Sequence, residues 1–128
     1  MLSDFPAYPV VPAADMVRAR RFYEETLGFI PIMDTPGGIA YRAKDSMLFV
    51  YPSEFAGTNK ATAAGFTVVD IAATVAELKG RGVRFEEYDM GEFKTVGGIA
   101  ETPGALGAWF KDTEGNIISL VQLDEPMA

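Results

Sequence analysis

The chain has 128 residues, 48% of them hydrophobic, and its 18 acidic and 11 basic residues give a formal net charge of −7. This length and apolar content suit one compact domain with its own core, while the negative charge disfavours binding to nucleic acids and to anionic lipid surfaces. Histidine and cysteine are both absent, which excludes disulfides, thiol nucleophiles and catalytic dyads with a histidine base.

No apolar run of the sequence approaches the roughly 20 residues that a membrane-spanning helix needs. Residues 1–6 do not begin with the basic stretch and long apolar stretch of a secretory signal. Together with the lack of cysteine, these features predict a cytoplasmic protein that does not contact a membrane.

The first predicted unit opens with a short strand at residues 8–11, followed by a helix that starts after Asp15. The Asp15 carboxylate can accept hydrogen bonds from the free N–H groups of the first helical turn. Gly28 ends the helix, because glycine adopts the left-handed conformation at little cost. Three short apolar runs, at residues 29–33, 38–42 and 46–51, then predict three strands. The apolar stripe of the helix consists of Met16, Ala19, Phe22, Tyr23 and Leu27.

A second unit repeats this order after a polar linker at residues 52–62. A strand at 65–69 leads to Asp70, a second helix cap, and to a helix that ends at Gly80 or Gly82. Apolar runs at 84–88, 105–110 and 117–122 predict three further strands. Both units therefore have the order strand, helix, strand, strand, strand.

The glycine-rich segment 89–104 fits neither unit simply. Long connections in compact domains are often lids over binding sites, and Phe93 and Lys94 lie near the middle of this one. The other interpretation is an edge strand from Thr95 to Glu101. The sequence leaves both open.

Three motifs in the right order resemble those of the vicinal oxygen chelate superfamily, which includes glyoxalases, bleomycin-resistance proteins and extradiol dioxygenases. They are Asp15-x-x-Arg18-Ala19-x-x-Phe22-Tyr23-x-x-x-Leu27-Gly28-Phe29, Phe66-x-Val68-x-Asp70 and Phe110-x-Asp112-x-x-Gly115-Asn116. The resemblance implies an α+β fold in which two βαβββ modules form a concave, cup-like mixed sheet with the helices outside. We expect one domain over residues 1–128, with modules at about 6–54 and 62–124.

The resemblance also implies where a metal would bind in this superfamily. The corresponding positions hold Tyr8, Ala63 and Ser119, and by the internal repeat Phe49. Divalent metals in such enzymes prefer imidazole or carboxylate ligands, so we expect no metal and no cofactor. Glyoxalase and extradiol dioxygenase chemistry are disfavoured for the same reason.

The predicted function is the binding or sequestration of a small organic molecule in a metal-free pocket, as in the bleomycin-resistance branch. One alternative is a metal-independent lyase or isomerase of the same superfamily, with Glu101 as the first catalytic candidate and Glu86 and Glu87 behind it. Another is a structural or regulatory dimer without a ligand. The resemblance implies a homodimer, in which modules pair within one chain or exchange between chains. The residues expected to bind the ligand are Tyr8, Phe49, Tyr51, Ala63, Trp109 and Ser119.

Overall fold

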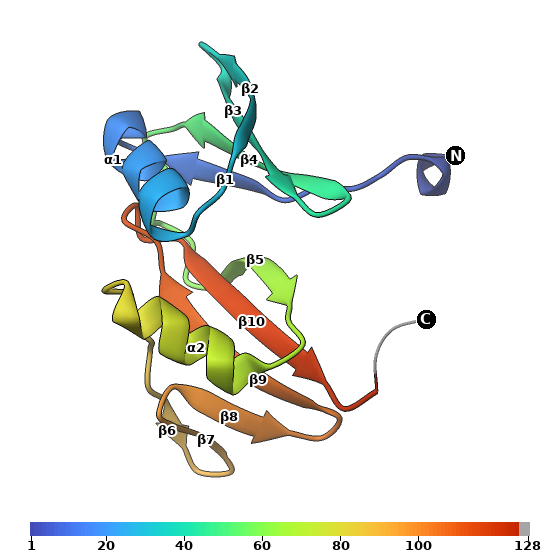
Figure 1. Cartoon of the computed structure of the whole chain (residues 1–128), viewed down its shortest axis with the longest axis vertical. Coiled ribbons are helices and arrows are strands. Elements are labelled where there is room, and N and C mark those ends of the chain that lie inside the picture. The colour runs from blue at the N-terminus through green and yellow to red at the C-terminus, as the bar shows by residue number, and fades with distance from the viewer. Residues whose placement is uncertain (126–128) are drawn as a thin grey trace.

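The computed structural model describes residues 1–125, which form two mixed β-sheets that each carry one helix (Figure 1). In the first sheet the strand order is β1-β4-β3-β2; β1 and β4 are parallel and the other pairs antiparallel. A short 3₁₀ turn, η1 (Leu2–Asp4), precedes it. The elements of this first module are β1 (Val10–Ala13), α1 (Met16–Arg21), the π turn η2 (Phe22–Thr26), β2 (Pro31–Thr35), β3 (Gly38–Ala43) and β4 (Ser46–Pro52).

The second sheet repeats this topology and extends it at one edge. Its strand order is β5-β10-β9-β8-β7-β6, and β5 and β10 are parallel as β1 and β4 are. Two modules of the predicted α+β fold are therefore present, the second with two additional strands. The elements of the second module are β5 (Thr62–Thr67), α2 (Ile71–Gly80), β6 (Asp89–Met90), β7 (Phe93–Val96), β8 (Ile99–Thr102), β9 (Ala105–Lys111) and β10 (Ile117–Leu123). No helix within residues 1–125 is long and apolar enough to cross a bilayer.

The strand predicted at residues 84–88 is wrong. Phe85 forms an isolated bridge with Phe110, and the strand equivalent to β2 is instead β8. The backbone bonds of residues 84–88 are irregular: the Glu86 N–H donates to the Trp109 carbonyl at 2.8 Å, whereas the Tyr88 N–H donates to Thr95 Oγ1 at 2.7 Å. These bonds satisfy backbone groups without the regular ladder that the apolar pattern predicted.

The glycine-rich segment is part of the sheet, so the edge-strand interpretation is correct in outline. It forms three strands, β6, β7 and β8, where one was expected. The turn between β7 and β8 is made by Gly97 and Gly98, whose φ angles of 62° and 85° lie in the left-handed region that favours glycine.

Both predicted helix caps are confirmed. The Arg18 N–H donates to Asp15 Oδ1 and the Ala73 N–H to Asp70 Oδ1, each at 3.1 Å. The first helix is α-helical only to Arg21 and continues as the π turn η2, which closes with a bond from the Leu27 N–H to the Phe22 carbonyl. Gly28 and Gly82 end the two helices with φ angles of 79° and 90°.

The two modules share a single core on the side of the sheets that carries the helices. Tyr23 and Tyr41 are fully buried there and stack with ring centroids 5.9 Å apart. Phe29 of the first module contacts Phe66 of the second at 5.8 Å. The modules therefore pack against each other within one chain, and both helices lie on the same side of the molecule (Figure 1).

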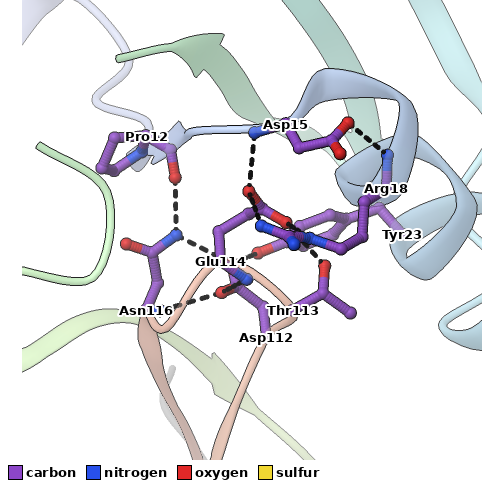
Figure 2. Close-up of polar contacts among 8 residues, drawn as sticks. All are labelled: Pro12, Asp15, Arg18, Tyr23, Asp112, Thr113, Glu114 and Asn116. Carbon is purple, nitrogen blue, oxygen red and sulfur yellow. Dashed lines mark hydrogen bonds and ion pairs between the residues drawn. The ribbon is translucent and has the colours of Figure 1, made fainter. Parts of the chain in front are cut away.

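Polar contacts join the modules at the turn between β9 and β10 (Figure 2). Asp112 Oδ2 accepts hydrogen bonds from the Tyr23 hydroxyl at 2.6 Å and from Asn116 Nδ2 at 2.8 Å. Its other oxygen accepts from the backbone N–H groups of Glu114 and Asn116. Asn116 Nδ2 also donates to the Pro12 carbonyl at 2.7 Å. Burial raises the pKa of Tyr23, and the neighbouring Asp112 carboxylate raises it further, so the hydroxyl remains a donor.

Glu114 of the same turn accepts hydrogen bonds from residues at the start of α1. Its side chain is fully buried; Oε1 accepts from the Asp15 N–H at 2.9 Å and Oε2 from Arg18 Nε at 2.7 Å. Burial opposes ionisation, but the hydrogen bonds from Arg18, Asp15 and Thr113 lower the pKa of Glu114 overall. We call Arg18, Tyr23, Asp112, Glu114 and Asn116 the inter-module clasp. All but Glu114 belong to the motifs noted in the sequence.

Replacing Tyr23 by Phe removes one hydrogen bond to a buried carboxylate and keeps the ring. We expect the free energy of unfolding to fall by about 1.5–3 kcal/mol, measured by urea denaturation. Tyr88→Phe is the matched control, since Tyr88 is half-buried outside the clasp, and it should change stability by less than about 0.5 kcal/mol. Equal losses in the two variants would contradict the role given to the clasp.

Candidate functional site

The face of the sheets opposite the helices is the candidate binding surface. Side chains alternate along each strand, so on β4 Leu48 and Val50 enter the core while Phe49 and Tyr51 point to the other side. We call this second side the open face. Phe49 and Tyr51 are only partly covered within one chain.

Module 1 brings three of the predicted ligand-binding residues to the open face. Phe49 pairs with Val10 and Tyr51 with Pro12 in the parallel β1–β4 ladder. The Phe49 N–H donates to the Pro9 carbonyl at 3.0 Å, which extends the ladder to the residue after Tyr8. By alternation with the buried Val11, Tyr8 lies on the same side, and it is 47% exposed.

Module 2 places Trp109 and Ser119 directly opposite each other. They are register partners across β9 and β10, and Ser119 also pairs with Gly65 on β5. A Cβ atom at Gly65 would lie 2.8 Å from Ser119 Oγ, so the hydroxyl fills the space that a larger residue at position 65 would take. Ala63 lies at a bulge of β5 and packs against the core.

Two further aromatic residues join Trp109, and the sequence did not predict their role. The ring centroids of Phe93 and Tyr88 lie 5.4 Å and 5.8 Å from that of Trp109, both edge to face. We call Tyr88, Phe93 and Trp109 the aromatic triad. Its sequence signal was the pair of aromatic residues that flank residues 89–92. Burial raises the pKa of Tyr88, assisted by the charge of Glu86, so this ring stays neutral.

The predicted residues thus fall into two groups, one in each module, which adjoin where β1 contacts β5. Within residues 1–125, none of the six lines a described cavity. Apart from Ala63, which packs against the core, they form two patches on the open face and not the wall of a closed pocket.

The four positions that correspond to a metal site do not suit a divalent metal. They offer a phenol, a phenyl ring, a methyl group and a hydroxyl, whereas such metals take imidazole, thiolate or carboxylate ligands. Elsewhere in residues 1–125, no group of three or more His, Cys, Asp or Glu side chains could hold a metal ion.

Glu101 lies away from the aromatic triad. It is exposed on β8 and pairs with Leu106, which packs against the core. Register partners share a face, so Glu101 belongs to the side of the helices while Trp109 belongs to the open face. Glu87 is exposed as well, with its carboxylate bound to the Gly98 N–H.

Comparison with known proteins agrees with the fold and the motifs. The bleomycin resistance determinant encoded on the transposon Tn5 superposes with a TM-score of 0.72 at 21% identity, over 94% of this chain and 99% of that one. TnmS3, an antibiotic binding protein from Streptomyces sp. CB03234, gives 0.64 at 26% identity, over 91% and 93%. A glyoxalase/bleomycin resistance protein/dioxygenase from Alicyclobacillus acidocaldarius gives 0.68 at 16% identity, over 95% and 93%.

Curated protein sequences contain no significant match. A family model, however, covers residues 6–120, which includes both modules, both helix caps and the clasp. The chain therefore belongs to the Glyoxalase/Bleomycin resistance protein/Dioxygenase superfamily.

Proposed function

We propose that the protein binds a small, partly apolar organic molecule on the open face without a metal, and so sequesters it. The observation that carries this proposal is the aromatic triad, whose rings are half-buried on the open face beside the buried Ser119. The antibiotic-binding protein TnmS3 is 26% identical over most of both chains, which supports a binding role for this chain.

The chemistry of the triad indicates what kind of ligand would bind. Aromatic rings offer large, rigid contact areas, and stacking adds about 0.5–1.5 kcal/mol per ring pair beyond the buried area. The Ser119 hydroxyl can donate or accept one hydrogen bond and so orient a polar group. The chain carries a net charge of −7, and, after burial, the negative charge of nearby Glu86 helps to raise the pKa of Tyr88. We therefore expect planar aromatic ligands that are neutral or cationic.

The enzyme alternative needs a carboxylate beside the bound molecule. Glu101 is exposed and lies on the opposite side of its sheet from Trp109, which argues against Glu101 as the acid–base group. Glu86, whose charge assists burial in raising the pKa of Tyr88, is then the carboxylate on which this alternative depends. A structural dimer without a ligand would require the triad to be filled by the partner's side chains.

We also propose that two chains form a homodimer. The N-terminal segment extends away from the rest of the chain (Figure 1), and Leu2 and Phe5 are 85% and 69% exposed. Large apolar side chains in this state favour burial against another surface. A second copy could cover them together with the open face, as closed two-fold symmetry would allow.

Light scattering on the purified protein tests the dimer. We expect a mass of about twice the 13.8 kDa of one chain, and truncation of residues 1–5 should shift the equilibrium toward the monomer. A single-chain mass at all protein concentrations would contradict the dimer while leaving the binding proposal open to its own test.

The binding proposal is tested by titrating the protein with planar aromatic compounds, with proflavine as the cationic member, while following Trp109 fluorescence. Trp109 is the only tryptophan, so its signal reports on the open face. Phe93→Ala should weaken binding about tenfold, because it removes one ring of the triad. Phe55→Ala is the matched control, since Phe55 is 67% exposed in the linker, and it should leave binding unchanged.

Two results would overturn the proposal. Equal affinities of the Phe93 and Phe55 variants would place the ligand elsewhere. Loss of binding in EDTA, with recovery on adding a divalent metal, would show that the site depends on a metal.

A further inference from the structure

A cavity of about 610 Å³ lies at the junction of the modules, away from the aromatic triad. Its wall is formed by residues 27–30 after η2, residues 42–44 and 46–48 around the β3–β4 turn, residues 65–67 of β5, and Pro9. The volume falls in the range of about 300–1,000 Å³ that small-molecule sites occupy. None of Tyr88, Phe93, Trp109 and Ser119 contributes to it.

The charge of this wall is opposite to that of the whole chain. Arg42 and Lys44 line the cavity, and no Asp or Glu does. The four other described cavities each have at least one carboxylate in their walls. Within residues 1–125, neither Arg42 nor Lys44 forms an ion pair. Two cations without carboxylate partners therefore face one site of a protein whose net charge is −7.

The rest of the wall is largely apolar. Leu27, Phe29, Ile30, Met47 and Phe66 supply hydrocarbon and aromatic surface, and Ile30 is 69% exposed. A ligand that covered these side chains would remove apolar area from water. The site thus combines apolar walls with positive charge.

Lys44 is also held in an unusual backbone conformation. Its φ of 55° makes it the one non-glycine residue with positive φ within residues 1–125. Asparagine or glycine is more usual at such a turn position. Lysine is strained in this backbone conformation, and its charged side chain lines the cavity. Strained positions of this kind concentrate at functional sites.

We propose that this cavity is a second binding site, which takes an organic anion with one acidic group and an apolar body. Arg42 and Lys44 would bind the acidic group, and the side chains from Leu27 to Ile30 with Phe66 would cover the body. The site uses no residue of the aromatic triad, so variants of Arg42 and Lys44 test it separately from binding at the triad.

The test compares two fluorescent probes with similar ring systems. Anilinonaphthalene sulfonate is an anion, and N-phenylnaphthylamine lacks the sulfonate. In the variant Arg42→Gln/Lys44→Asn, the sulfonate probe should bind about five- to tenfold more weakly, while the neutral probe changes less than twofold. Both residues are exposed, and asparagine suits the backbone at position 44, so the thermal midpoint should not fall.

Lys60→Gln/Arg84→Gln is the matched control. It removes one lysine and one arginine from exposed positions outside this cavity, and it should leave the affinity for the sulfonate probe within twofold of the parent. Decanoate should displace the sulfonate probe, whereas inorganic phosphate at the same concentration should not, because it lacks the apolar body.

Three outcomes would overturn the inference. Equal losses of affinity for the sulfonate probe in the two double variants would show that overall charge, and not this cavity, causes the effect. If phosphate displaced the sulfonate probe as well as decanoate does, the apolar walls would not contribute to binding. Loss of sulfonate binding in Phe93→Ala but not in Arg42→Gln/Lys44→Asn would move the probe to the open face, and in that case the proposed function would stand while this second site would not.

Discussion

The structure depends on two buried carboxylates, Asp112 and Glu114, in one turn of the second module. Between them they accept hydrogen bonds from the Tyr23 hydroxyl, the Arg18 guanidinium and the Asp15 backbone, all in the first module. A buried carboxylate is costly unless its oxygens are satisfied, so this turn stabilises the chain only when α1 lies against it. The clasp therefore sets how the two sheets meet, and it directs the helices to one side and the open face to the other.

The residues that stabilise the junction of the modules are different from those proposed to bind ligands. The pKa of Tyr23 is raised and that of Glu114 is lowered, and both side chains have their hydrogen bonds within the chain, so these shifts reflect packing. The open face and the cavity beside Arg42 differ from the clasp. The aromatic rings of the open face are partly exposed, and Arg42 and Lys44 form no ion pair with residues 1–125. The superfamily fold is thus present with Tyr8, Phe49, Ala63 and Ser119 at the positions where the resemblance implied a metal site, which agrees with function depending on the site and not on the fold.

Local features of the sequence predicted the architecture well. Asp15 and Asp70 could be identified as caps because capping involves residues three positions apart. Contacts between residues far apart in the sequence could not be predicted from it. The clasp joins residues 89 and 96 positions apart, and Tyr88 and Phe93 reach Trp109 only after residues 84–88 leave the ladder and β6 and β7 extend the sheet. The same departure made the strand prediction at 84–88 wrong.

Methyl NMR can show whether small molecules bind the open face. Val121 and Leu120 are neighbours on β10, but Leu120 packs in the core while Val121 alternates to the face of Ser119. Ala108, next to Trp109, is a second core reporter. With proflavine at saturation, the account predicts shifts of the Val121 methyl signals and little change for Leu120 and Ala108. Shifts confined to Leu120 and Ala108, or absent from all three residues while proflavine is bound, would contradict it.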